Sequence, residues 1–275
     1  MTLPSVMAHL RAHGVEPTKA LGQNFLTDLN ITHKIARAAG DLHQHTVIEV
    51  GPGPGGLSRA ILAEGPARLL CVEQDTRLSN LLDEIGAEYS NFSVIYGDAL
   101  TTNLLDLGPA PRRVIANLPY NVATPLLLGW LRQWHDQADA FASLTLMFQK
   151  EVVDRLVAQP RTKAYGRLSV MAQWICQVEA CFDLPPHVFL PPPKVTSTVA
   201  HFQRRDHGRD HVPGDFEKME RVVAAAFGQR RKTLKKAMKS TFPHIEDALN
   251  TQHIPLTARA EELSINEFIA LAQVL

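Results

Sequence analysis

The stretch VIEVGPGPGGL, residues 47–57, is an apolar run that opens into a glycine loop and continues into the helical pattern of residues 57–64. A strand, a glycine loop and a helix in this order form the first unit of a doubly wound α/β sheet, in which ligands bind at the carboxyl ends of the strands. Further apolar runs predict strands at residues 69–72, 92–96, 113–116 and 143–148. The sequence therefore predicts an α/β, Rossmann-like fold.

Acidic or amide side chains stand near the ends of four predicted strands, at Glu49, Glu73, Asp98 and Asn117. Because strand ends of a doubly wound sheet meet at one edge, we expect these side chains to face one ligand. A carboxylate after the second strand suits a ribose diol, and one after the third suits the amino group of an adenine. A single Gly-Asp turn is an ordinary loop, but chance turns explain the whole series poorly.

The glycine loop formally satisfies the G-x-G-x-x-G pattern of nicotinamide enzymes, and Glu73 stands where their acidic residue would bind ribose. S-adenosylmethionine suits the same layout. Pro52 and Pro54 have no N–H group, so this loop is a poor cradle for a pyrophosphate. The sequence thus favours S-adenosylmethionine and leaves a nicotinamide oxidoreductase as the alternative.

The sequence Asn117-Leu118-Pro119-Tyr120 follows the strand at residues 113–116. The side chain of Asn117 and the Leu118 carbonyl present two acceptors to one amine, because a proline follows residue 118. Tyr120 offers a flat face on which a nucleobase could stack. The alternative is a strand end followed by an ordinary proline turn.

Residues 184–195 contain five prolines and predict a stiff loop that projects Val188 and Phe189, unless Phe189 fills the core beneath it. We expect helices at 6–15, 150–158 and 167–178, a cap at Asp28 for the next helix, and a closing strand at 196–202.

The chain changes character after a polar linker at residues 204–215, so we expect domains at 1–204 and 205–275. Residues 216–239 predict an amphipathic helix with a possible break at Gly228. Six basic residues fall in the second half of this helix: Arg230, Arg231, Lys232, Lys235, Lys236 and Lys239. All but Arg230 share the face away from the apolar stripe. We expect this face to contact phosphates; the alternative is an ordinary solvated surface.

Composition sets the remaining limits. A formal net charge of +0 excludes a binder of nucleic acid over its whole surface, and three cysteines without a C-x-x-C pair fit a reducing cytoplasm. No apolar run approaches the roughly 20 residues of a membrane span, and residues 1–19 lack the apolar block of a signal peptide. His207 and His211 stand at helical spacing without further ligands, so we expect no metal. We expect a monomeric cytoplasmic protein.

These motifs together resemble the small-subunit (16S) ribosomal RNA adenine dimethyltransferases, which methylate two adjacent adenines near the 3′ end of the RNA. The large-subunit RNA methyltransferases share the first domain, but the last three stretches below are specific to the small-subunit family. The stretches are LGQNFL (21–26), EVGPGPGGL (49–57), VEQD (72–75), GDA (97–99), NLPYN (117–121), QKEVVDRLVA (149–158), YGRLSV (165–170), FLPPPKVTS (189–197) and FGQRRKTLKK (227–236).

The resemblance implies a class I methyltransferase fold with a small helical C-terminal domain, S-adenosylmethionine as cofactor, S-adenosylhomocysteine as product and an immature small ribosomal subunit as partner. A role in ribosome assembly apart from catalysis stays open. Tyr120 and Phe189 would hold a flipped-out adenine between them, beside Asn117, Leu118 and Pro119. For the cofactor, the resemblance implies closure by Asn24 and Leu26, contact of Gly51 with the methionine part, ribose binding by Glu73, adenine recognition by Asp98 and bridging to the substrate by Asn117.

Overall fold

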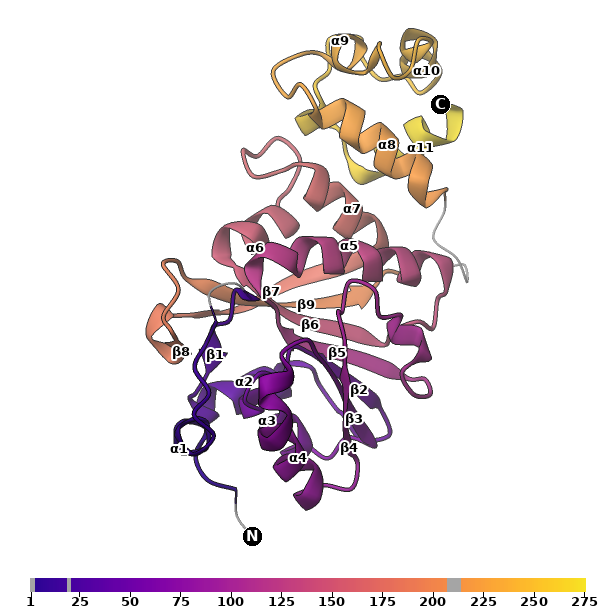
Figure 1. Ribbon diagram of the computed structural model, residues 1–275. Coiled ribbons are helices and arrows are strands. Elements are labelled where there is room, and N and C mark those ends of the chain that lie inside the picture. The colour runs from indigo at the N-terminus through magenta and orange to yellow at the C-terminus, as the bar shows by residue number, and fades with distance from the viewer. Residues whose placement is uncertain (1–2, 19–20, 207–213) are drawn as a thin grey trace. The chain divides into compact units, whose positions relative to one another are not determined.

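A computed structural model describes residues 3–18, 21–206 and 214–275 of the chain (Figure 1). His207, His211 and most of the predicted linker lie outside the described residues. Contacts divide the chain into two units. The first holds residues 1–129, 139–150 and 179–203, and the second holds 130–138, 151–178 and 204–275. This division also assigns internal segments to the second unit, so the sequence-continuous domains at 1–204 and 205–275 stay a prediction.

A seven-stranded sheet of order β4-β3-β2-β5-β6-β9-β7 carries the fold. The five neighbouring strands β4, β3, β2, β5 and β6 are parallel to one another, and β9 pairs antiparallel with β6. All five strands expected at the start of the chain are confirmed, as is the closing strand β9. The bounds are β2 Thr46–Val50, β3 Arg68–Glu73, β4 Phe92–Tyr96, β5 Arg112–Asn117, β6 Ser143–Gln149, β7 Cys176–Leu184 and β9 Ser197–Arg204.

Helices follow the strands of the first unit, as the doubly wound pattern predicts. Helix α3 starts directly after the glycine loop and packs against α2, whose predicted cap is confirmed because the Asp28 carboxylate accepts a hydrogen bond from the Asn30 amide. The bounds are α1 Val6–Ala12, α2 Leu29–Ala38, α3 Gly56–Ala63, α4 Ser79–Glu88 and α5 Tyr120–Asp136, which continues into the second unit. No described helix is long and apolar enough to cross a bilayer.

Two short strands far apart in sequence close the N-terminal side of the first unit. Strand β1, Phe25–Leu26, pairs antiparallel with β8, Phe189–Leu190, and the two lie side by side in Figure 1. The proline-rich segment was expected to form a stiff loop that projects Phe189. Instead Phe189 is 3% exposed and belongs to the hydrophobic core, which is the alternative that the sequence left open.

Four predicted helices end earlier than expected. Those predicted at 6–15 and 150–158 stop at Ala12 and Leu156. The helix predicted at 167–178 stops at Ile175, and residues 176–178 begin β7, where the alternation of small apolar and polar residues in CQVEACF favours an extended chain. The helix predicted at 216–239 breaks at Gly228 and resumes only at Leu234. The break that the sequence allowed at Gly228 is therefore confirmed. Arg231 and Lys232 lie in the turn that follows, so the helical face predicted to carry them together with Lys235, Lys236 and Lys239 is wrong.

The second unit is helical apart from the ends of two strands. Its core is aromatic: the rings of Phe227 and Phe268 stack at 5.8 Å, and Tyr165 donates from its hydroxyl to the Leu263 carbonyl oxygen at 3.0 Å. The helices are α6 Lys150–Leu156, α7 Arg167–Ile175, α8 Phe216–Phe227, α9 Leu234–Met238, α10 Ile245–Thr251 and α11 Ile265–Val274.

Candidate active site

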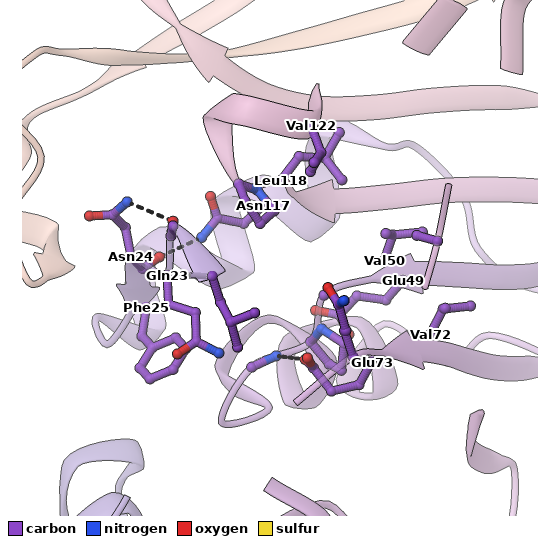
Figure 2. Close-up of a pocket in the computed structure, with 18 of the residues that line it drawn as sticks. Gln23, Asn24, Phe25, Glu49, Val50, Val72, Glu73, Asn117, Leu118 and Val122 are labelled. Atoms are coloured by element: carbon purple, nitrogen blue, oxygen red, sulfur yellow. Dashed lines mark hydrogen bonds between the residues drawn. The ribbon is translucent and has the colours of Figure 1, made fainter. Parts of the chain in front are cut away.

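One cavity in the first unit collects the predicted strand-end residues (Figure 2). The N-terminal segment 21–26, the glycine loop and the ends of β2 to β5 all contribute to its wall. The structure therefore brings together residues spread over about a hundred positions, as the sequence predicts. Those named in advance are Asn24, Leu26, Glu49, Gly51, Glu73, Asp98, Asn117, Leu118, Pro119 and Tyr120.

Glu73 is fixed by the backbone around it. Its Oε2 accepts from the Gly53 amide at 3.1 Å and its Oε1 from the Asp75 amide at 2.8 Å. The side chain is 6% exposed, and this burial raises its pKa. Each carboxylate oxygen keeps a further lone pair, so Glu73 can still accept from two neighbouring hydroxyl groups of a ligand.

Glu49 lies deeper in the wall of the same cavity. Its Oε2 accepts from the Ser58 hydroxyl at 2.5 Å and from the Cys71 thiol at 3.6 Å, and the residue is 1% exposed. Burial raises the pKa of Glu49 to about 8, and the negative charge of Glu73 adds to this. The Glu49 carboxyl therefore holds its proton far more firmly than an exposed glutamate does.

Asp98 meets the cavity from the loop after β4. It is exposed, and its Oδ1 accepts from the Leu100 amide at 2.9 Å, which holds the carboxylate in a tight turn. Oδ2 is the oxygen that remains to receive a ligand donor.

The Asn117 side chain has a defined orientation. It contacts the Asn24 carbonyl oxygen at 2.8 Å (Figure 2), and because a carbonyl can only accept, the Asn117 amide nitrogen must face it. The Oδ1 atom of Asn117 is therefore left for a donor in the cavity. The amides of Val122 and Ala123 both bind the Pro119 carbonyl, so helix α5 takes its first acceptor from residue 119 and not from Leu118.

Of the two predicted stacking rings, only Tyr120 lines the cavity. It is the first residue of α5, and its hydroxyl lies 2.6 Å from the Ser197 Oγ, which fixes the ring. Burial raises the pKa of Tyr120, so it stays a neutral phenol. Phe189 is buried in the core and is not part of the cavity wall.

The glycine loop and the N-terminal segment touch closely enough to require glycine at two positions. A Cβ atom on Gly56 would lie 2.6 Å from the Leu26 carbonyl oxygen, and one on Gly53 would lie 3.0 Å from the Phe25 ring. Gly53 also has a φ of 56°, which other residues rarely adopt. Glycines here let strand β1 close this side of the cavity.

Comparison with known proteins identifies the family. The family model described as ribosomal RNA adenine dimethylase matches residues 16–275. The chain belongs to this family. Ribosomal RNA small subunit methyltransferase A of Rhodospirillum rubrum is 51% identical to it, over 98% of this chain and 92% of that protein. The protein of the same name from Agrobacterium fabrum is also 51% identical, over 99% of this chain and 98% of the relative.

Solved structures support the fold of this chain. A dimethyladenosine transferase from Plasmodium falciparum superposes with a TM-score of 0.74 at 24% identity, covering 90% of this chain and 95% of that one. The 23S rRNA methyltransferase ErmE gives 0.66 at 25% identity, covering 91% and 98%. The predicted fold, a class I methyltransferase sheet with a helical C-terminal part, is confirmed.

The six basic residues predicted to bind RNA fall into two groups. Arg230 donates to the Tyr165 carbonyl at 2.8 Å and pairs with Glu261 at 3.3 Å, and Lys235 pairs with Glu246 at 2.8 Å. These two cations already have partners within the second unit. The other four are exposed: Arg231, Lys232, Lys236 and Lys239.

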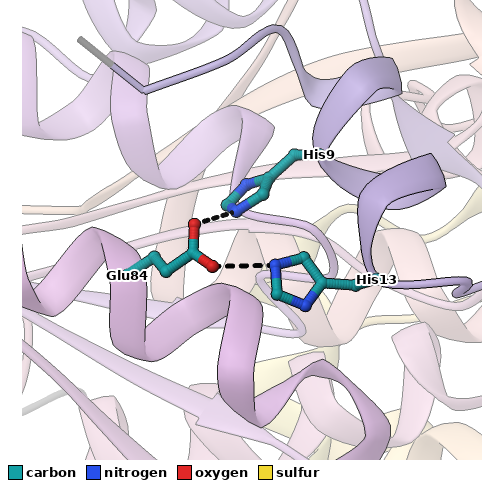
Figure 3. Close-up of side chains that lie close together, drawn as sticks. All are labelled: His9, His13 and Glu84. Carbon is teal, nitrogen blue, oxygen red and sulfur yellow. Dashed lines mark hydrogen bonds and ion pairs between the residues drawn. The ribbon is translucent and has the colours of Figure 1, made fainter. Parts of the chain in front are cut away.

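A further cluster of possible metal ligands lies outside the cavity, where helix α1 faces helix α4 (Figure 3). Among the described residues, His9 and His13 place their Nε2 atoms 2.7 and 2.9 Å from the Glu84 carboxylate. Arg59 contacts His9 Nδ1 at 2.6 Å, and since a guanidinium only donates, the His9 proton must sit on Nε2. That nitrogen then has no lone pair for a metal, so the cluster is a polar link between two helices.

The sequence prediction missed several polar residues: Gln23 in the cavity wall, and Asp75, His9 and His13 outside it. His9 and His13 stand at the same spacing as His207 and His211 but were passed over. Gln23 and Asp75 belong to the motifs LGQNFL and VEQD, yet neither motif shows that they bind each other. The four-residue spacing of the histidines was a usable signal, whereas the contact between Gln23 and Asp75 needs the fold.

Proposed function

We propose that this protein transfers methyl groups from S-adenosylmethionine to N6 of two adjacent adenines near the 3′ end of small-subunit ribosomal RNA. The products would be N6,N6-dimethyladenosines and S-adenosylhomocysteine. The family and the names of its relatives support this class of reaction. The observation that carries the proposal is the Asn117 amide, whose Oδ1 is directed away from Asn24 in a cavity that also holds Glu73.

The cavity fits a nucleoside cofactor that has no phosphate. Glu73 is oriented to accept from the ribose diol, and Asp98 keeps an oxygen for the adenine amine. Gly51 would lie against the methionine part, and Asn24 and Leu26 would close over it from the N-terminal segment. When bound, the cofactor supplies an electrophilic methyl group on a sulfonium.

The residues of this chain hold the substrate amine rather than deprotonate it. The lone pair of an adenine amine is delocalised into the ring, so its nucleophilicity depends on how its hydrogens are held. Asn117 Oδ1 and the Leu118 carbonyl accept those hydrogens and direct the nitrogen at the methyl group, while Pro119 shapes the turn. Tyr120 stacks on the flipped base, a contact worth about 1–3 kcal/mol. We do not assign this role to Phe189, which is buried.

A neutral amide at position 117 also suits two rounds of methylation. After the first round the amine offers one hydrogen instead of two, and a neutral acceptor loses less than a carboxylate when one partner is missing. The proton released after transfer comes from a cationic amine and needs no strong base. We propose that a monomer carries out both rounds in the cytoplasm on immature small subunits, held through the exposed basic residues of the second unit.

The test is methyl transfer from labelled S-adenosylmethionine to small ribosomal subunits that lack the modification, with naked RNA and large subunits as controls. We expect dimethyladenosine on the small subunit only. Asn117→Ala should lower the rate by about 10²–10³, the usual effect of removing one oriented polar group from a reacting centre. Full activity in Asn117→Ala with unchanged cofactor affinity would refute the assigned mechanism.

A further inference from the structure

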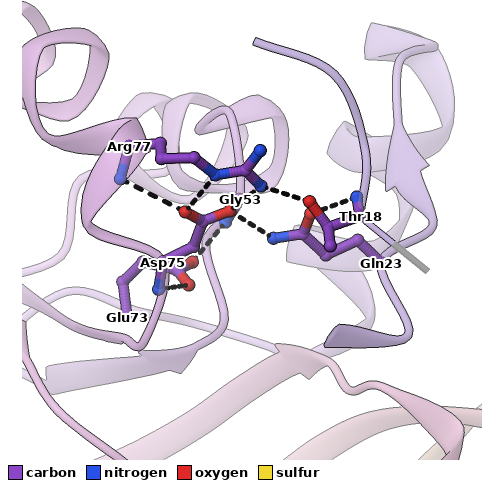
Figure 4. Close-up of polar contacts among 6 residues, drawn as sticks. All are labelled: Thr18, Gln23, Gly53, Glu73, Asp75 and Arg77. Carbon is purple, nitrogen blue, oxygen red and sulfur yellow. Dashed lines mark hydrogen bonds and ion pairs between the residues drawn. The ribbon is translucent and has the colours of Figure 1, made fainter. Parts of the chain in front are cut away.

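The side chain of Gln23 joins the N-terminal segment to the loop after β3 (Figure 4). Its Oε1 accepts from the Thr18 amide at 2.8 Å, and its Nε2 donates to Asp75 Oδ2 at 2.8 Å. The Thr18 amide can only donate and the Asp75 carboxylate can only accept, so the orientation of the Gln23 side-chain amide is defined. Gln23 therefore connects two segments 52 positions apart in sequence.

The partner of Gln23 is a rigid anchor. Asp75 is 4% exposed and accepts from Arg77 Nε at 2.8 Å and Nη2 at 2.6 Å, which lowers the pKa of its carboxyl. The same guanidinium donates to the Thr18 hydroxyl at 2.5 Å. Asp75 also donates its backbone amide to Glu73. The anchor thus holds the N-terminal segment on one side and the ribose-binding carboxylate on the other.

The residue after Gln23 controls the catalytic amide. Asn24 presents the carbonyl oxygen that accepts from Asn117 Nδ2 at 2.8 Å and so selects the orientation of the Asn117 side chain. The other hydrogen bonds of residues 21–24 are local: Leu21 and Gln23 donate from their backbone amides to the Thr18 carbonyl at 3.2 and 3.4 Å, and Asn24 Nδ2 donates to the Gly22 carbonyl at 3.2 Å. Pairing with β8 holds the chain from residue 25 onward. The Gln23 side chain ties residues 21–24 to the loop after β3, and so helps to place the Asn24 carbonyl.

We propose that Gln23 is a positioning residue for methyl transfer. By tying the N-terminal segment to Asp75, it keeps the Asn24 carbonyl over Asn117 and keeps Asn117 Oδ1 directed at the substrate amine. This inference rests on the proposed function, because the amine is the substrate of that reaction. It also implies that the cofactor side of the site, at Glu73, and the substrate side, at Asn117, are joined through one side chain.

The test uses Gln23→Glu, which keeps the size and the acceptor for Thr18 but places a carboxylate against Asp75. We expect kcat to fall by about tenfold to a hundredfold, since small misplacement of a reacting group has effects of this size, with a much smaller change in KM for the RNA. The matched control is Asn80→Asp, the same chemical change at an exposed residue of α4.

Hydrogen exchange of residues 21–26 gives a readout that does not depend on activity. We expect faster exchange in Gln23→Glu than in the wild type, and wild-type exchange in Asn80→Asp. Unchanged kcat and unchanged exchange in Gln23→Glu would overturn the inference. Failure of the wild type to methylate any subunit would instead overturn the proposed function, and the exchange result would still test the connection between Gln23 and Asp75.

Discussion

Replacing Glu49 by glutamine is expected to change how the stability of this protein depends on pH. The Glu49 carboxyl is 1% exposed and its charge would lie beside that of Glu73, so its pKa rises from 4.5 to about 8, chiefly through burial. Glutamine has nearly the same shape and can still accept from Ser58 through its carbonyl oxygen. The substitution therefore removes the ionisation while keeping the contact.

The direction and size follow from linkage between folding and protonation. The pKa of Glu49 is 4.5 in the unfolded chain and about 8 in the folded chain. Its contribution to the free energy of unfolding is therefore fully present below pH 4.5 and is lost progressively as the pH rises from 4.5 to about 8. Each pH unit in this interval costs about 1.4 kcal/mol, so the wild type loses about 5 kcal/mol across it through this group alone. Glu49→Gln should not show this loss.

The assay is urea unfolding followed by far-ultraviolet circular dichroism, for the wild type and Glu49→Gln at pH 5 and pH 8.5. All other titrating groups are common to both proteins, so the change in their stability difference between the two pH values isolates Glu49. The control is Glu16→Gln, the same substitution at an exposed position. If the difference between wild type and Glu49→Gln were the same at both pH values, the burial argument for Glu49 would be refuted.

Two further variants test other parts of the structure. Gly56→Ala places a methyl group 2.6 Å from the Leu26 carbonyl oxygen, so strand β1 must move. Titration calorimetry should show S-adenosylhomocysteine binding weakened by about tenfold, roughly the 1–3 kcal/mol cost of overpacking. Unchanged affinity would contradict the closure of β1 over the site. The slope of log affinity for RNA against log salt is negative, and Lys232→Gln combined with Lys236→Gln should reduce its magnitude by about 1.4–1.8, the value for two phosphates. An unchanged slope would remove these lysines from the RNA contact.

The sheet and the polar residues at its edge could be predicted from sequence because each depends on local pattern. Apolar runs of strand length identify β2 to β6, and a parallel sheet necessarily brings their carboxyl ends together. The cavity that contains Glu73, Asp98 and Asn117 follows from this rule. The ligand roles of these residues stay predictions, since location at a strand end does not by itself identify the ligand.

The parts that could not be predicted depend on contacts between distant segments. Strands β1 and β8 are two residues each, too short for any periodicity, and their pairing buries Phe189 where the prolines alone indicated a projecting loop. The sequence allowed a break at Gly228, but not the turn over residues 228–233, which takes Arg231 and Lys232 off the predicted helical face. The contact of Arg230 with the Tyr165 carbonyl also joins segments that are far apart in sequence. Tertiary partners decide both cases.

The requirement for asparagine at position 117 shows how the local motif and the distant contact act together. The motif N-L-P-Y explains why an acceptor stands at the end of β5, but aspartate is an equally good acceptor. What distinguishes them is the Asn24 carbonyl, 93 positions earlier, which needs a donor and would repel a carboxylate. The amide can meet both demands at once: it donates to the N-terminal segment, and in the proposed mechanism it accepts from the substrate amine. The chemistry of residue 117 is therefore set as much by the position of residue 24 as by its own strand.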